Sequence, residues 1–292
     1  MRRLLDLAVT EEGPPPVRFA WLALGSHARR EPMLSSDMDS AIAWIGDDAD
    51  PRTRSYVQCV AKRVVEALQR GGIVPCVRGA SAAHPAFARS LASWESEVAR
   101  WQADPSMEQA LMLSSVVAEA RPVWGMHAGA PLMAAFRDVR SKQLLLRGLA
   151  RLALTHRPPT GFLRDLVVEH TGAHAGRLDL KHGGILPIVD LARYAGLAAG
   201  VSSASTRERL RAAAGAGTLP TSDARTLEAA FDLLTDLKLD HQVAQVQAEE
   251  PPDDYLDPAS LDQLTRSYLR EAFRAVAKVQ RRIASDVDLG VR

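Results

Sequence analysis

The sequence predicts a mixed α/β (α+β) domain with a small mixed sheet, followed by a mostly α-helical bundle. An unbroken apolar run from Phe19 to Leu24 is typical of a strand buried on both faces, and a second strand-like run, Ser40 to Ile45, follows it. From Gly129 onward, apolar residues recur every three or four positions over long stretches, which predicts helices. The chain therefore combines two architectures in one sequence.

With 292 residues, the chain is long enough for two domains that each bury a core. We expect a linker helix in residues 1–16, an α/β domain in residues 17–128 and a helical domain in residues 129–292. The helix is expected because the short segment Arg2 to Ala8 is amphipathic, and Thr10-Glu11-Glu12-Gly13-Pro14-Pro15-Pro16 follows and ends it.

Further elements of the first domain follow from periodicity and from glycine and proline. A helix is expected from Arg54 to Gln69, then an edge strand from Ile73 to Val77, because Pro75 cannot donate to a ladder. Another helix is expected from Pro85 to Gln102, with its aromatic residues in the core rather than stacked on bases. The stretch from Leu113 to Gly125 is expected to contain a fourth strand, with alternate side chains on one face, namely Val117, Glu119, Arg121 and Val123.

The second domain is expected to be a helical bundle with one small hairpin. Its predicted elements are a helix over Ala130–Thr155, a hairpin formed by Phe162–Val168 and Arg177–Leu180, and helices over Thr206–Ala214, Ser222–Gln247 and Pro258–Ser285. The last helix carries an apolar stripe that we expect in the core, namely Leu261, Leu264, Tyr268, Ala272, Val276, Val279 and Ile283.

The end of the first strand carries the strongest chemical signal. Gly25 permits a sharp turn, and the short helix expected from Ser26 to Glu31 would begin with unpaired amide N–H groups, an arrangement that attracts phosphate. Asp37 and Asp39 precede the second strand and, because strand side chains alternate, should point to one face. Two carboxylates beside a phosphate site indicate Mg²⁺ (or Mn²⁺), since Mg²⁺ prefers oxygen ligands and substrate phosphates.

This pattern resembles the nucleotidyltransferase superfamily of the DNA polymerase beta type, whose signature is Gly-Ser, a short helix and Asp-x-Asp on the next strand. Within it, the chain is most similar to protein-PII uridylyltransferases and glutamine synthetase adenylyltransferases, and to nucleotidyltransferases found behind CBS and cyclic-nucleotide-binding domains. Six residues stand where the uridylyltransferase pattern has them, namely Gly25, Arg29, Glu31, Ser36, Asp37 and Asp39. The competing interpretation is that a Gly-Ser turn and an Asp-x-Asp are each common surface features.

The resemblance implies roles for these residues. Asp37 and Asp39 would bind the metal, while Gly25, Ser26 and Arg29 would hold nucleotide phosphates. Glu119 stands where the related families have an Asp that is a candidate third catalytic acid and metal ligand. The longer Glu side chain would shift the carboxylate, and small displacements are costly in catalysis. The alternative is that Glu119 only pairs with a neighbouring arginine at the surface.

A second resemblance lies in the helical half. A Lys-x-Gly-Gly turn that opens an apolar helix recurs in the helical domains of the related families, and here it is Lys181-His182-Gly183-Gly184. Lys181 could reach a nucleotide phosphate or an acidic partner as a point charge. The alternative is that the paired glycines only allow close packing. His170 and His174 lie four residues apart, but Gly172 and Gly176 argue against a metal-binding helix there.

Composition narrows the functional classes. With 36 Lys+Arg against 35 Asp+Glu, no overall field draws the chain to nucleic acid or to an anionic membrane, and no apolar run approaches a membrane span. Cys59 and Cys76 are the only cysteines, and we expect buried thiols in a cytoplasmic protein.

These observations predict a nucleotidyltransferase that moves a nucleoside monophosphate from ATP or UTP to an acceptor hydroxyl. The resemblance suggests an acceptor on a PII-like or other regulatory protein, and hence a role in signal transduction. A catalytically impaired nucleotide-sensing or scaffold module is the alternative, and the third acid is the feature that discriminates between them.

Overall fold

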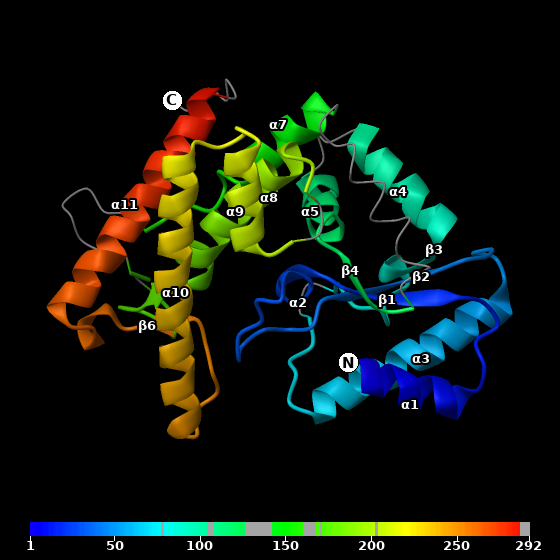
Figure 1. The fold of residues 1–292 in the computed structure, drawn as a ribbon. Coiled ribbons are helices and arrows are strands. Elements are labelled where there is room, and N and C mark those ends of the chain that lie inside the picture. Colours follow the sequence, from blue (N-terminus) through cyan, green and yellow to red (C-terminus); the bar gives the residue numbers. More distant parts are fainter. Residues whose placement is uncertain are drawn as a thin grey trace. The chain divides into compact units, whose positions relative to one another are not determined.

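The structure, a computed structural model, describes residues 1–76, 79–103, 108–125, 142–159, 168–169, 171–201 and 204–286. The chain forms two compact units (Figure 1). The first comprises Met1–Pro32, Ser36–Lys142 and Ser202–Ser205, and the second comprises Met33–Ser35, Gln143–Val201 and Thr206–Arg292. The boundary expected at residues 128 and 129 lies outside the described residues and stays a prediction.

The first unit is built on a four-stranded sheet in the order β3-β2-β1-β4. Its strands are β1 (Phe19–Ala23), β2 (Ser40–Trp44), β3 (Ala88–Ser90) and β4 (Arg121–Trp124). β1 pairs antiparallel with β2 and β4, whereas β3 joins β2 in parallel. All residues of β1 and β2 are buried, as expected for central strands covered on both faces. The predicted small mixed sheet is confirmed.

Two helices cover one face of this sheet, α1 (Arg2–Glu12) and α3 (Pro51–Arg70) (Figure 1). α3 begins at Pro51 because Asp50 accepts the first free N–H groups of the helix and proline fits its first turn. The shared core combines alternate strand residues with the inner faces of both helices, namely Leu5, Ala8, Phe19, Trp21, Ile42, Trp44, Val57, Val60, Ala61 and Val64.

The first helix is part of this core, although the sequence suggested a linker. Leu5 of α1 is fully buried, and the Tyr56 hydroxyl of α3 donates to the Gly13 carbonyl at 2.6 Å. Arg63 of α3 also pairs with Glu11 at 2.9 Å. These contacts fix the N-terminal helix on the sheet.

The second half of this unit departs from the prediction in two places. Ile73–Cys76 forms no strand, and Val77 lies outside the described residues. The third strand is instead β3, which follows the short 3₁₀ helix η1 (Pro85–Phe87), so that α4 covers only Leu91–Ala103. Pairing of β3 with β2 overrides the helical periodicity of this stretch, because edge positions are decided by tertiary contacts.

The predicted fourth strand is also shorter than expected. Helix α5 (Glu108–Val117) occupies its first part, a turn follows, and β4 covers only Arg121–Trp124. Val117 and Glu119 therefore do not lie on the strand. The predicted aromatic core of the preceding helix is confirmed, since Trp94 and Trp101 of α4 are buried and Trp94 Nε1 donates to the Ile42 carbonyl at 2.9 Å.

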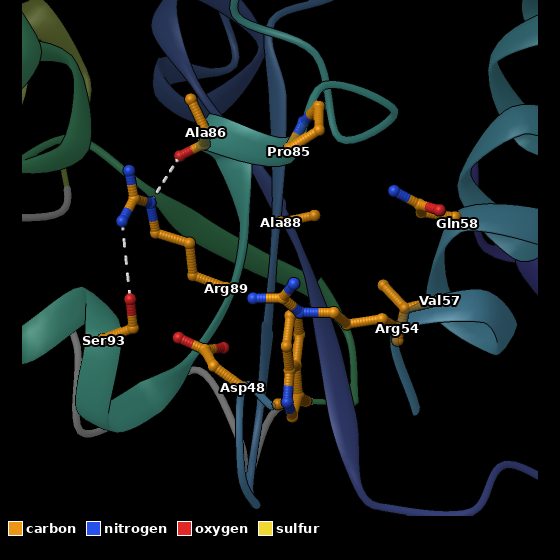
Figure 2. A pocket seen from close by; sticks show the side chains of 10 residues that line it. Asp48, Arg54, Val57, Gln58, Pro85, Ala86, Ala88, Arg89 and Ser93 are labelled. Atoms are coloured by element: carbon orange, nitrogen blue, oxygen red, sulfur yellow. Dashed lines mark hydrogen bonds between the residues drawn. The ribbon is translucent and has the colours of Figure 1, made fainter. Parts of the chain in front are cut away.

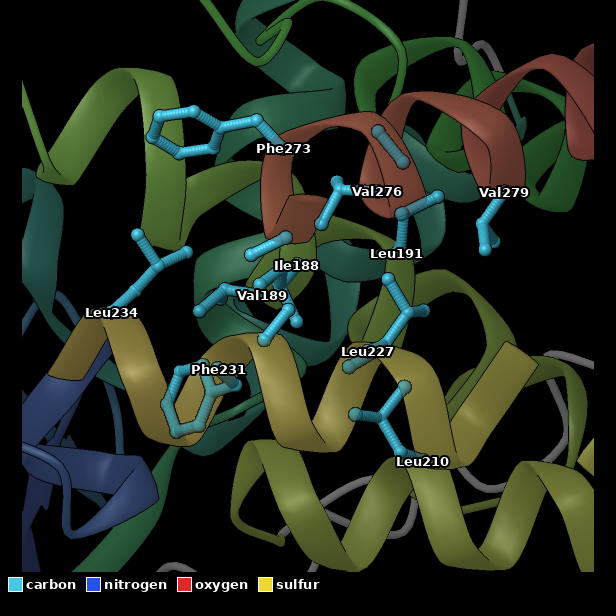
Figure 3. Close-up of a cluster of buried hydrophobic side chains, with 14 of the residues drawn as sticks. Ile188, Val189, Leu191, Leu210, Leu227, Phe231, Leu234, Phe273, Val276 and Val279 are labelled. Carbon is cyan, nitrogen blue, oxygen red and sulfur yellow. The ribbon is translucent and has the colours of Figure 1, made fainter. Parts of the chain in front are cut away.

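The second unit is helical and encloses the larger core (Figure 3). Its helices are α7 (Gln143–Leu152), η3 (Lys181–Ile185, a π-helix), α8 (Leu186–Ala198), α9 (Thr206–Gly215), α10 (Thr221–Gln247), η4 (Pro258–Ser260) and α11 (Gln263–Asp286). Buried residues from α8, α9, α10 and α11 meet in one cluster, and those labelled in Figure 3 include Leu191, Leu210, Phe231 and Phe273.

Two details of this unit differ from the prediction. The buried face of α11 is shifted, because Leu264 and Tyr268 are 60% and 55% exposed, whereas Leu269 and Phe273 are fully buried. In addition, β5 (Leu178–Asp179), which lies within the expected arm Arg177–Leu180, pairs antiparallel with β6 (Tyr255–Leu256), a strand that the sequence analysis did not predict. Residues 162–167 of the expected first hairpin arm and residues 130–141 of the expected first helix lie outside the described residues, and α7 lies within the rest of that expected helix.

The segment Met33–Ser35 belongs to the helical unit although it interrupts the first one. Gln242 of α10 accepts from Leu34 N at 3.0 Å and donates to Ser35 Oγ at 2.7 Å. Ser35 Oγ in turn donates to Asp254 at 2.8 Å. Three hydrogen bonds therefore hold this short segment on the helical unit.

In the described part of the chain, no helix combines the length and the hydrophobicity needed to cross a membrane.

Gly125 generates a stability prediction. It has a φ of +64°, and a Cβ there would lie 2.0 Å from the Phe19 carbonyl oxygen of β1. We expect Gly125→Ala to destabilise the protein by about 3 kcal/mol or more, because both the backbone strain and the clash with a central strand must be accommodated. Urea unfolding followed by tryptophan fluorescence measures the change.

Gly72→Ala is the matched control. Gly72 has a φ of +85° but nothing lies within 4 Å of its added Cβ, so only the backbone term of about 1 kcal/mol should appear. Equal losses in the two variants would contradict the steric explanation.

Candidate active site

The turn after β1 is shaped by a close approach between Gly25 and Asp39. Gly25 opens the short helix α2 (Gly25–Arg29) with a φ of +54°. A Cβ at this position would lie 2.6 Å from Asp39 Oδ2. The left-handed backbone conformation favours glycine, and an added Cβ would displace the Asp39 carboxylate from this position.

The two aspartates are placed by the pairing of β1 with β2. The ladder continues beyond the strands, because Leu24 N donates to the Asp39 carbonyl at 3.0 Å. Asp37 and Asp39 are two residues apart on this extended segment, so their side chains share a face. One carboxylate oxygen of each, together with Cys76 Sγ, lies within 4.8 Å of the others, and all three residues are partly exposed. The predicted placement of the aspartate pair is confirmed, whereas its metal-binding role stays a prediction.

The start of α2 is partly exposed and has no side-chain cap. Leu24 at the N-cap is apolar and supplies no side-chain cap for the first N–H groups, and Ser26 is partly exposed beside it. These groups are the ones that the sequence predicted to hold phosphates.

His27 is a residue of this turn that the sequence analysis did not single out. Its Nε2 atom is buried and has no hydrogen-bond partner among the described residues. Burial lowers the pKa of His27 from its ordinary value, Asp37 opposes that shift and Arg121 reinforces it. The imidazole is therefore neutral at neutral pH. Only its position next to Ser26 could have drawn attention to it.

Arg29 and Glu119 form a buried ion pair. Arg29 Nη1 lies 2.5 Å from Glu119 Oε2, and Arg29 Nε lies 3.0 Å from Glu31 Oε2. Glu119 is 1% exposed in the turn between α5 and β4. In the described part of the chain it is not a member of the group formed by Asp37, Asp39 and Cys76. The arginine partner foreseen as the alternative for Glu119 is present, but the pair is buried rather than on the surface.

Arg121 holds the other end of α2. Its Nε and Nη2 atoms donate to the Ala28 and His27 carbonyls, both at 2.9 Å. These bonds satisfy the last carbonyl groups of the helix, where a cation is favourable. The sequence analysis placed Arg121 only on a strand face, and its helix-capping role depends on tertiary structure.

Lys181 lies in the helical unit, where it begins η3. Its Nζ lies 3.9 Å from Asp254 Oδ2, and Asp254 Oδ1 bonds the buried Lys238 at 2.7 Å. A Cβ at Gly184 would lie 3.1 Å from Leu234, which supports the packing interpretation of the paired glycines. His174, from the other candidate metal pair, stacks on Tyr255 with ring centroids 3.6 Å apart, and His170 lies outside the described residues.

The first unit also contains a pocket of about 410 Å³ (Figure 2). Arg54, Arg89 and Asp48 line it, together with Trp44 at the end of β2. Asp37 and Asp39 precede the start of the same strand, so this pocket is not the candidate site.

Two family models match separate parts of the chain. Residues 1–108 match the family model described as "Putative nucleotidyltransferase DUF294", and residues 143–287 match "Putative nucleotidyltransferase substrate binding domain". The chain belongs to this nucleotidyltransferase family. A search of curated proteins found no match. The closer likeness to protein-PII uridylyltransferases stays a prediction.

A nucleotidyltransferase of this family is expected to use a divalent cation, and the residues present fit one. The aspartate pair supplies closely spaced oxygen ligands, and the glycine at position 25 leaves room for the Asp39 carboxylate beside the turn. The remaining positions around a cation would be available to phosphate oxygens and water.

The buried ion pair generates a second stability prediction. Glu119→Gln should destabilise the protein by about 3–5 kcal/mol, because it leaves Arg29 buried with reduced charge compensation. The midpoint of thermal unfolding measures the change.

Glu11→Gln is the control for this substitution. The Arg63–Glu11 pair is about half exposed on both sides, and such surface pairs contribute about 0–1 kcal/mol. A Glu119→Gln variant as stable as Glu11→Gln would contradict a structural role for the buried pair.

Proposed function

We propose that this nucleotidyltransferase moves a nucleoside monophosphate from ATP or UTP to an acceptor hydroxyl, with Mg²⁺ or Mn²⁺ as cofactor. The observation that carries the proposal is the position of the Asp37 and Asp39 carboxylates beside the Gly25-Ser26 turn. The residues proposed to bind phosphate and metal therefore lie together at one end of the β1–β2 pair. The family assignment supports the same reaction class.

In the proposed reaction, the acceptor oxygen attacks the α-phosphorus of the nucleotide. The bond from that phosphorus to the bridging oxygen breaks, pyrophosphate leaves, and the acceptor proton passes to a base. A bound divalent cation would offset the negative charge of the triphosphate and of the leaving group. Asp37 and Asp39 would hold it, while the N–H groups and hydroxyl at Gly25 and Ser26 would bind phosphate oxygens.

Glu119 has two possible roles in this proposal. By resemblance it would be the third acid, either as a metal ligand or as the base. Its contact with Arg29 supports a positioning role, in which Glu119 holds the guanidinium next to the α2 turn. Glu119→Asp separates the two roles. A third acid with better geometry would raise kcat at unchanged nucleotide affinity, whereas a shortened ion pair would lower stability without raising kcat.

A nucleotide-sensing or scaffold module is the second candidate function. The observation that favours it is that Glu119 is engaged with Arg29 rather than grouped with Asp37 and Asp39. A sensor would bind NTP in the presence of Mg²⁺ and release no pyrophosphate. Calorimetric NTP binding and a pyrophosphate-release assay on the same sample distinguish the two functions.

The helical unit is the proposed site of acceptor recognition. Its family model is described as a substrate-binding domain, and the catalytic turn by itself provides no means of orienting a hydroxyl. We propose that the acceptor hydroxyl belongs to a PII-like or other regulatory protein and that Lys181 contacts this protein. The alternative role of Lys181 is contact with the nucleotide phosphates.

The metal pair generates the first functional prediction. Asp37→Asn or Asp39→Asn should reduce Mg²⁺-dependent pyrophosphate release at least about 100-fold, because each removes a negative metal ligand. Neutralising one of two adjacent carboxylates should leave the unfolding temperature unchanged or slightly raised. Asp240→Asn, at an exposed position of α10, is the control and should retain full activity. Undiminished turnover in both site variants would overturn the site.

Lys181 generates the second functional prediction. If it recognises the acceptor, Lys181→Ala should raise the KM for the acceptor several-fold and leave the KM for NTP unchanged. Lys278→Ala, at an exposed position of α11, controls for loss of one positive charge. Weaker NTP binding by Lys181→Ala in calorimetry without acceptor would instead assign the lysine to the nucleotide.

A further inference from the structure

Cys76 lies in the candidate metal site, where sequence analysis expected only carboxylates. Its Sγ atom and one oxygen each of Asp37 and Asp39 lie within 4.8 Å of one another. The chain has only one other cysteine, Cys59, which is exposed on α3, and neither residue forms a disulfide. The expectation of two buried thiols is therefore wrong, because Cys59 is exposed and Cys76 is only half-buried.

The position of Cys76 is fixed by backbone pairing on both sides of it. The segment that follows α3 runs beside the aspartate segment, with Met38 N donating to the Val74 carbonyl at 3.3 Å. Beyond Cys76, Ser40 N donates to the Ala80 carbonyl at 2.9 Å. These bonds lie on either side of Cys76 in the sequence, and they align its segment with the segment that carries the aspartates.

We propose that Cys76 is the third ligand of this site and that, with Asp37 and Asp39, it binds a thiophilic divalent cation of the Zn²⁺ class. The inference rests on the same aspartate pair as the proposed transfer reaction and adds a ligand that this reaction does not require.

Ligand chemistry gives the site its selectivity. Mg²⁺ takes oxygen ligands almost exclusively, whereas Zn²⁺ and Co²⁺ bind thiolate and carboxylate together. Three protein ligands leave at least one coordination position for water or a phosphate oxygen, as in zinc sites that are open to substrate. On binding, the Cys76 thiol loses its proton to the solvent and the thiolate donates to the metal.

A consequence is competition between two cations for one site. Mg²⁺ would bind through Asp37 and Asp39 alone, while a thiophilic cation would use all three residues and bind more tightly. Zn²⁺ would therefore displace Mg²⁺ at much lower concentrations. The site would respond to the balance of available metals in addition to the nucleotide.

The test uses Co²⁺ as a spectroscopic probe on the full chain without nucleotide. In a Cys59→Ser background, Cys76 is the only thiol, and the exposed serine should leave the fold and the basal activity unchanged. Co²⁺ titration should then give a thiolate-to-metal charge-transfer absorption in the near ultraviolet. Zn²⁺ should abolish that absorption and slow the modification of Cys76 by a thiol reagent.

Adding Cys76→Ser should remove the absorption and weaken Co²⁺ binding in calorimetry at least about tenfold. Co²⁺ binding of equal affinity in both backgrounds, with no charge-transfer absorption, would overturn the cysteine ligand and leave the aspartate pair and the transfer reaction standing. Absence of Co²⁺ binding in the Cys59→Ser background would also contradict the proposal that Cys76 is a metal ligand. If the same protein in addition showed no Mg²⁺-dependent turnover, the proposed transfer reaction would be contradicted too.

Discussion

The antiparallel pairing of β1 and β2 is the constraint on which the site depends. Trp21 and Ile42 lie in the core shared with α1 and α3, and a one-residue slip of the register would move one of them to the opposite face of the sheet. The same register, continued by the bond from Leu24 to Asp39, brings the end of one strand next to the start of the other. The packing of apolar side chains in the core thereby places the Asp37 and Asp39 carboxylates beside the tight turn at Gly25.

The parts of this arrangement that were predictable from sequence share one property: their signal is local. The apolar run from Phe19 to Leu24, the turn at Gly25 and the alternation of Asp37 and Asp39 each occupy a few consecutive residues, and the structure places them as expected. The long amphipathic helices α10 and α11 were found for the same reason, because periodicity over several turns is a strong signal.

The features that sequence missed depend on partners far along the chain. Glu119 was expected on a strand, but a helix and a turn precede β4, and the partner of the carboxylate is Arg29, ninety residues away. Cys76 was placed in an edge strand with no indication that it lay beside the aspartates. β3 is three residues long and lies in a stretch whose periodicity predicted a helix. It forms a strand because it pairs with β2. No window of neighbouring residues contains these contacts.

The three residues Met33–Ser35 mean that the two units cannot be separated by a single cut in the chain. A fragment ending before Gln143 would keep Leu34 and Ser35 but lose Gln242 and Asp254, their hydrogen-bond partners. The helical half expressed alone would likewise lack the segment that Gln242 binds. Recombination that exchanges the helical unit between relatives is therefore restricted. A helical unit from a relative would have to bind the segment Met33–Ser35, which is encoded with the first unit and ends two residues before Asp37.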